Sequence, residues 1–108
     1  MITFIAHLQV PPENADAFEN LMTNVAAMSN EHEPGVTYYA FAKSVDQHDT
    51  YVVVEVYRDQ VAVAAHGETE WVRDSIPEML GLIEGMPRIA QYVSPGAEPV
   101  ASQFEELT

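Results

Sequence analysis

Two strand–helix–strand patterns follow one another along this chain of 108 residues, and their order constrains the fold more than any other feature. Residues 2–10 place apolar side chains at every second position, which is typical of a strand. A Pro-Pro pair ends this strand, because proline cannot donate to a strand ladder. Residues 13–32 repeat apolar side chains at helical spacing. The Glu-Pro-Gly sequence at 33–35 then favours the end of that helix.

The second half of the chain repeats this order. Residues 36–44 and 50–57 are rich in Val, Tyr and Phe and predict two strands joined by a turn. Residues 59–84 predict a helical region, and Gly67 is expected to break it into a short and a longer helix. Residues 88–93 predict the last strand.

The resulting order, βαββαβ, predicts an α+β fold of the ferredoxin-like type, with helices on one face of an antiparallel sheet. We assign residues 1–96 to this single domain and residues 97–108 to a polar tail, in which Phe104 and Leu107 could contact a neighbour. Both faces of the strand at 50–57 carry apolar side chains, so we expect the face without helices to be covered rather than exposed to solvent. The pattern therefore predicts a homodimer that pairs two such faces.

Charge and composition exclude several classes of function. Seventeen acidic residues and four basic ones give a net charge of −13, which disfavours binding to nucleic acids and to anionic membranes. No apolar run approaches the roughly 20 residues of a membrane helix, and the first ten residues do not resemble a signal peptide. Cysteine is absent, as fits a reducing cytoplasm, so we expect a cytoplasmic protein without disulfides.

The residues with the most chemistry surround one predicted strand–helix junction. Glu55 and Tyr57 are two apart on a strand and point to the same face, and Asp59 is a good N-cap for the next helix. His66 lies one turn after Ala62 on that helix. Two further aromatic residues could complete a pocket: Tyr39 and Trp71.

Each candidate also has a purely structural interpretation. His66 suits a general base near neutral pH, but it could equally fix the junction through a hydrogen bond to Glu55. His7 belongs either to the pocket or to the dimer side, His32 suits a helix C-terminus, and His48 lies in a turn. A metal site at residues 31–33 is disfavoured because consecutive helical side chains point apart.

The same residues resemble a known family. The spacing Glu55-x-Tyr57-x-Asp59-x-x-Ala62-x-x-x-His66, preceded by E-P-G-x-x-x-Y at 33–39, is similar to the motifs of the antibiotic biosynthesis monooxygenase (ABM) domain. The resemblance covers nearly the whole chain. It implies a dimeric α+β barrel with a pocket between the sheet and the helices of each subunit.

The resemblance also implies a function. ABM monooxygenases oxidise phenolic or quinol-like aromatic compounds with O2, without a metal or another cofactor, and the sequence has no nucleotide or zinc-protease motif. On this reading His66 is the catalytic base and Glu55 its partner. The substrate-binding residues would be Tyr39, Tyr57 and Trp71.

Departures from the family pattern keep other functions open. Tyr57 stands where most members have Trp, as in the LsrG-like branch that isomerises a small phosphorylated carbonyl compound in autoinducer-2 processing. That reaction would need an anion site near Arg58, Arg73 or Arg88. Haem-degrading members carry a ligand His where this chain has Ile76, which cannot bind iron. A non-catalytic, dimeric protein that binds small molecules or acts in a stress response is the third alternative.

Overall fold

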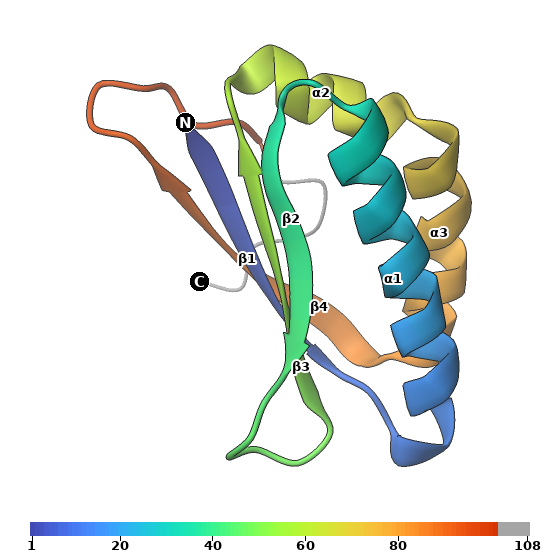
Figure 1. Ribbon diagram of the computed structural model, residues 1–108. Coiled ribbons are helices and arrows are strands. Elements are labelled where there is room, and N and C mark those ends of the chain that lie inside the picture. The colour runs from blue at the N-terminus through green and yellow to red at the C-terminus, as the bar shows by residue number, and fades with distance from the viewer. Residues whose placement is uncertain (102–108) are drawn as a thin grey trace.

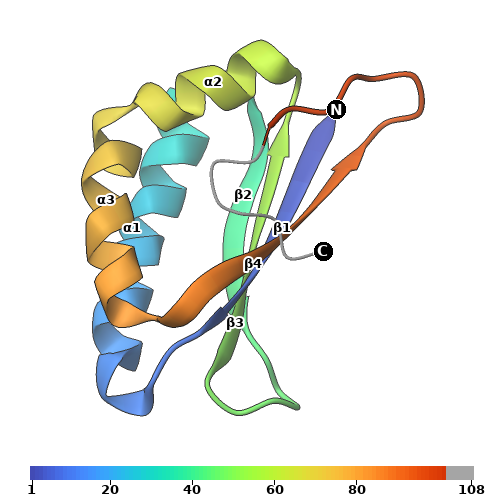
Figure 2. The ribbon, with the colours of Figure 1, turned by 180° about the vertical axis from the view of Figure 1, so that it is seen from behind.

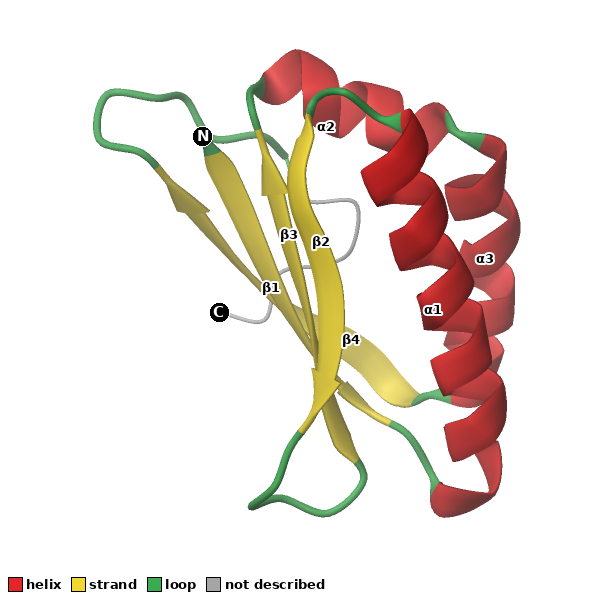
Figure 3. Cartoon of the chain, viewed as in Figure 1, coloured by secondary structure: helices red, strands yellow, loops and turns green. Residues whose placement is uncertain are grey.

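The computed structural model describes residues 1–101, so the residues predicted to contact a neighbour, Phe104 and Leu107, lie outside the described part. Four strands and three α-helices follow the predicted order (Figures 1 and 3). The strands are β1 (Ile2–Gln9), β2 (Val36–Lys43), β3 (Thr50–Tyr57) and β4 (Glu84–Val93). The helices are α1 (Ala15–His32), α2 (Gln60–Glu68) and α3 (Glu70–Leu82), and a short 3₁₀ turn at Pro12–Asn14 precedes α1.

The strands form one antiparallel sheet in the order β2-β3-β1-β4. Figures 1 and 2 show all three helices on the same side of this sheet, while no helix formed by residues 1–101 covers its other face. The α+β, ferredoxin-like fold is therefore confirmed. Within residues 1–101, no helix is both long enough and apolar enough to cross a membrane.

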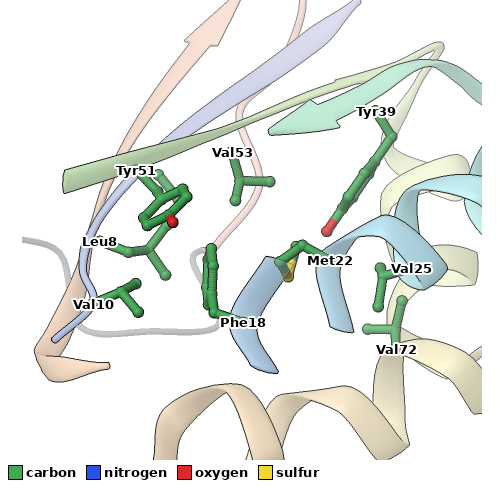
Figure 4. Close-up of a cluster of buried hydrophobic side chains, with 10 residues drawn as sticks. Leu8, Val10, Phe18, Met22, Val25, Tyr39, Tyr51, Val53 and Val72 are labelled. Carbon is green, nitrogen blue, oxygen red and sulfur yellow. The ribbon is translucent and has the colours of Figure 1, made fainter. Parts of the chain in front are cut away.

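The core lies between the sheet and helices α1 and α3. Figure 4 shows Phe18 and Met22 of α1 facing Tyr51 and Val53 of β3. The Phe18 ring is completely buried, and its centroid lies 4.8 Å from that of Tyr51. Fully burying side chains of this size stabilises the fold by about 1.5–3 kcal/mol each. This packing fixes the distance between the two layers.

The break in the second helical region differs from the prediction. Gly67 lies inside α2, and the chain leaves the helix at Thr69 instead. Thr69 has an extended backbone, and both its N–H and its hydroxyl donate to the carbonyl oxygen of His66, at 3.2 and 2.8 Å. The threonine therefore supplies its own substitute for the next helical hydrogen bond, an option that glycine lacks. The predicted N-cap is confirmed, because Asp59 accepts a hydrogen bond from the N–H of Ala62 at 2.9 Å.

The last strand is also longer than predicted, because β4 begins at Glu84 rather than at residue 88. Glu84 was expected to end the helix, but the helix ends at Leu82. A shift in register between His7 and Gln9 of β1 brings Gln9 opposite Glu84. Gly85 adopts a φ of 71°, a conformation that favours glycine. Pairing with β1 therefore extends β4 into residues whose sequence shows little alternation of apolar and polar side chains.

The strand register shows what the helix-free face presents. Ile5 of β1 lies opposite Val54 of β3, which in turn lies opposite Ala40 of β2. Tyr38 and Tyr92 flank this apolar centre and are 54% and 58% exposed. The prediction that the strand at 50–57 also carries apolar side chains on the face without helices is confirmed for these described residues.

The Glu-Pro-Gly sequence ends α1 and brings its C-terminus against the start of α2. The carbonyl oxygen of Gly35 accepts a hydrogen bond from the N–H of Arg58 at 2.8 Å. A Cβ atom on Gly35 would lie 2.4 Å from the Cβ of Ala62. Glycine is required at this position because α2 passes too close for any side chain.

Replacing Gly35 by alanine should therefore lower the free energy of unfolding by roughly 1–3 kcal/mol, the usual cost of overpacking. Gly81→Ala is the matched control, because nothing lies within 4 Å of a Cβ there and the residue is helical. The control should be neutral or should stabilise the protein by up to about 1 kcal/mol. Urea denaturation of both variants measures the difference. Equal stability of the two variants would contradict the close approach.

Candidate active site

A cavity of about 320 Å³ lies between the sheet and the helices. Polar side chains that contact one another supply part of its lining, namely Tyr39, Glu55, Tyr57 and His66. The remaining walls are mostly apolar and come from β1, β4 and all three helices: Phe4, Met22, Val63, Val72, Ile76, Met79 and Ile89. A pocket of this size and composition suits a small, mainly apolar ligand with one polar group.

His66 lies at the centre of the polar side chains. It comes from the last turn of α2 and is only 8% exposed. Its Nδ1 lies 2.9 and 3.1 Å from the two carboxylate oxygens of Glu33. Its Nε2 lies 3.8 Å from Oε1 of Glu55, which is beyond hydrogen-bonding distance. The partner of the imidazole is therefore Glu33, not the predicted Glu55.

Glu33 reaches His66 from the C-terminal end of α1, where it is the capping residue. Its side chain is 8% exposed. In addition to His66, the indole Nε1–H of Trp71 donates to its Oε2 at 2.8 Å. The E-P-G sequence thus has two functions in the fold: Gly35 permits the close approach of α2, and Glu33 uses that approach to reach a histidine on α2.

Glu55 and Tyr57 of β3 form a second linked pair, since the Tyr57 hydroxyl donates to Oε1 of Glu55. Burial raises the pKa of the Glu55 carboxyl, and the nearby Glu33 carboxylate raises it further, although the bond from Tyr57 and the neighbouring His66 act in the opposite direction. The pKa of Tyr57 is raised by burial and then by Glu55. Burial also raises the pKa of Tyr39. Both phenols therefore stay protonated at neutral pH.

The structure brings together most of the side chains singled out in the sequence. Tyr39, Glu55, Tyr57 and His66 all line the cavity, and Figure 4 shows the Tyr39 phenol pointing from β2 toward Met22 of α1. The fifth predicted residue lies differently. The Trp71 indole contacts Glu33 and the ring of His32, and it is not among the described residues of the cavity lining.

The other histidines lie away from this cavity. His7 is exposed and pairs with Val52 and Arg88 on the helix-free face, so it does not belong to the pocket. His32 ends α1, and His48 lies in the turn between β2 and β3. In the described range, 1–101, no group of three or more His, Asp or Glu side chains is arranged to hold a metal ion.

Sequence reasoning missed Glu33 as a site residue, although a signal was present. A carboxylate at the C-terminal end of a helix faces the negative end of the helix dipole, which is unfavourable. Such a residue needs another reason to be there, and the bonds from His66 and Trp71 supply it. The contribution of α3 to the cavity wall was also missed. The sequence signal for it was the helical spacing of Val72, Ile76 and Met79.

The segment that follows β4 borders the same cavity. The Gln91 side chain donates to the carbonyl oxygen of Val100 at 2.8 Å and accepts from its N–H at 2.9 Å. Gln60 at the start of α2 donates to the carbonyl oxygen of Glu98 at 3.1 Å. These bonds place Ala101 in the cavity lining. The first residues of the predicted tail therefore take part in shaping the pocket.

Comparison with solved structures gives many proteins of the same architecture. A candidate antibiotic biosynthesis monooxygenase from Caulobacter crescentus is 30% identical, with a TM-score of 0.80 over 84% of this chain and 86% of that chain. One from Nitrosomonas europaea is 21% identical, with a TM-score of 0.81 over 87% and 98%. Rv0793 from Mycobacterium tuberculosis is 17% identical, with a TM-score of 0.78 over 95% and 98%. The latter two likenesses concern the fold alone.

Sequence comparison identifies the family directly. No curated protein matches this chain. The family model described as antibiotic biosynthesis monooxygenase matches residues 1–77, which include α1, the E-P-G sequence, the strand–helix junction and His66. With well over half of its 108 residues matched, this chain belongs to the antibiotic biosynthesis monooxygenase (ABM) family.

Proposed function

We propose that this protein is a cofactor-independent monooxygenase that oxidises a small phenolic or quinol-like aromatic compound with O2. The observation that carries this proposal is the cavity, which combines apolar walls with a histidine whose Nε2 has no hydrogen-bond partner among the described residues. In this proposal His66 is the general base, Glu55 its acidic neighbour, and Tyr39 and Tyr57 bind the substrate. Trp71, predicted to bind substrate as well, instead holds Glu33 from outside the cavity lining.

The chemistry requires a base and a dry pocket. For an anthrone-like substrate, His66 takes a proton from the carbon that the phenolic ring system of the substrate activates. The resulting anion passes one electron to O2, and the substrate radical and superoxide combine to form a C–O bond. The peroxide then takes a proton back, loses its second C–H proton and breaks its O–O bond. The products are a carbonyl group and water, so R₂CH₂ and O₂ give R₂C=O and H₂O.

The two tyrosines suit this reaction because they remain phenols. Raised pKa values keep Tyr39 and Tyr57 protonated, so Tyr39 can donate a hydrogen bond to a ligand, Tyr57 donates to Glu55, and neither acts as a base near neutral pH. The apolar walls limit access of water to the anion, which lowers the chance that it is simply protonated again. The imidazole is then the group best suited to accept the first proton.

Charge in the pocket favours a neutral substrate over a phosphorylated one. The chain has four lysine and arginine residues: Lys43, Arg58, Arg73 and Arg88. None of them is among the described residues that line the cavity. Phosphate groups are usually held by several converging donors or cations. The isomerase alternative would need such a site, so a phosphorylated compound bound in the cavity would favour it. A protein that only binds aromatic ligands is the remaining alternative.

We also propose that the protein is a homodimer in which the helix-free faces of two sheets pair. We further propose that it acts in a reducing cytoplasm. The support for the dimer is the apolar centre around Val54 and the two exposed tyrosines beside it, since monomers rarely expose a large continuous apolar patch. In the same proposal residues 1–96 form the domain and residues 97–108 the tail.

His66→Ala should lower the rate of O2 consumption by about 10²–10⁴-fold with a reactive quinol or anthrone, because it removes the base. The matched control is His48→Ala, which alters an exposed turn residue. An oxygen electrode measures both rates, and fluorescence titration measures ligand binding. The proposal is wrong if the wild-type protein consumes no O2 with any such compound and His66→Ala leaves the binding of each one unchanged.

The raised pKa of Glu55 makes stability depend on pH. The native state keeps the Glu55 proton to a higher pH than the unfolded chain does, so it binds more protons between the two pKa values. The free energy of unfolding therefore falls as pH rises through this window. The contribution is fully present below the pKa of the unfolded state and is lost above that of the native state.

Glu55→Gln should remove this loss, because glutamine cannot ionise but can still accept a hydrogen bond from Tyr57. We expect a gain in the free energy of unfolding that grows as pH rises above the pKa of the unfolded-state carboxyl and levels off above the raised pKa of the native state. O2 consumption should fall at the same time. Glu68→Gln, at the exposed end of α2, is the matched control. A gain that is the same at every pH would contradict the buried-carboxyl argument.

Val54→Glu should convert the dimer into a monomer, because it places a charge at the centre of the helix-free face. Sedimentation velocity should show the mass fall from that of two chains to that of one. Val45→Glu is the matched control, since Val45 is 96% exposed in the turn between β2 and β3 and should leave the mass unchanged. A wild-type protein that sediments as one chain at all concentrations would contradict the dimer.

A further inference from the structure

His66 is surrounded in a way that leaves one edge of its ring for chemistry. The Tyr39 and Tyr57 rings flank the imidazole, with centroids 5.3 and 5.2 Å away. Its Nδ1 is held by the Glu33 carboxylate. What remains is Nε2, on the side of the cavity-lining residue Glu55. The surroundings therefore distinguish the two ring nitrogens.

Glu33 is itself held in place by contacts that do not involve His66. Its backbone N–H donates to the carbonyl oxygen of Ser29 at 3.1 Å, which completes the last turn of α1. Its Oε2 accepts from Trp71, whose indole nitrogen can only donate. A carboxylate with fixed backbone and fixed side chain presents its oxygens to His66 in one orientation.

The chemistry of the contact determines where the imidazole proton lies. An ionised carboxylate accepts hydrogen bonds and has no proton to donate. A bond between Glu33 and Nδ1 therefore requires the proton on Nδ1, and in the neutral ring this leaves Nε2 as the unprotonated nitrogen. Glu55 does not compete for this role, because it lies on the Nε2 side and its Oε1 already accepts from Tyr57.

We propose that Glu33 is a positioning residue that fixes His66 in the tautomer with its proton on Nδ1, so that Nε2 is free to take a proton from a molecule in the cavity. Trp71 assists indirectly by holding the Glu33 carboxylate. The consequence for catalysis rests on the proposed function. The tautomer itself does not, because it is a property of the protein without substrate.

The tautomer is measured directly by ¹⁵N NMR of the uniformly labelled protein without ligand, at a pH where the His66 ring is neutral. The ¹⁵N shifts of the two ring nitrogens, assigned with the help of His66→Ala, should show a protonated Nδ1 and an unprotonated Nε2 in the wild-type protein. Glu33→Gln should produce a mixture of tautomers, because the amide can donate to Nδ1 as well as accept from it. Glu33→Asp, which keeps the carboxylate, should retain at least part of the wild-type preference.

The matched control is Glu31→Gln, two residues earlier, whose side chain is 72% exposed. It should change neither the tautomer nor the activity. If O2 consumption is present, Glu33→Gln should lower kcat by roughly one to two orders of magnitude with a smaller change in KM. If Glu33 had only a structural role, Glu33→Gln would lower the free energy of unfolding without changing the His66 tautomer of the folded protein.

The outcomes separate this inference from the proposed function. A wild-type His66 with its neutral-state proton on Nε2 would overturn the inference, as would an unchanged tautomer in folded Glu33→Gln. The wild-type result needs no Glu33 variant, so a poorly folding Glu33→Gln does not remove the test. A protein that has the Nδ1–H tautomer but consumes no O2 would retain the positioning role of Glu33 and lose the monooxygenase proposal.

Discussion

The close approach of Gly35 to Ala62 is the constraint on which the rest of the site depends. With no Cβ at residue 35, the end of α1 and the start of α2 meet, and the bond between Gly35 and Arg58 joins them to the end of β3. Two side chains on these elements, Glu33 and His66, are then within hydrogen-bonding distance. A larger residue at position 35 would push α1 and α2 apart and so break the hydrogen bond between Glu33 and His66.

The site places several ionisable groups where water is scarce, which is costly for a domain of this size. The structure limits this cost by pairing: Glu33 accepts bonds from His66 and Trp71, and Glu55 accepts one from Tyr57. The raised pKa of Glu55 shows that pairing does not fully compensate for burial. Active sites commonly combine burial and charge in this way, and they sacrifice some stability for it.

The distribution of charge separates the surface from the cavity. The chain carries a net charge of −13, yet its cavity is mainly apolar, and two acidic side chains, Glu33 and Glu55, lie beside His66. An anionic ligand would be repelled both on approach and on entry. A neutral aromatic compound and O2 meet neither barrier. The apolar helix-free face adds a second, separate surface, so the catalytic and the association roles proposed for this domain involve opposite sides of one sheet.

The sequence by itself determined the order of the elements, the α+β class, the N-cap at Asp59 and the shared face of Glu55 and Tyr57, because each depends on residues close together in the chain. The helix break at Thr69 and the early start of β4 were not predictable, since one depends on a side-chain bond and the other on pairing with β1. The partner of His66 was decided only by the tertiary structure. Glu33 lies 33 residues away, and its contact exists because two helix ends pack against each other at a glycine.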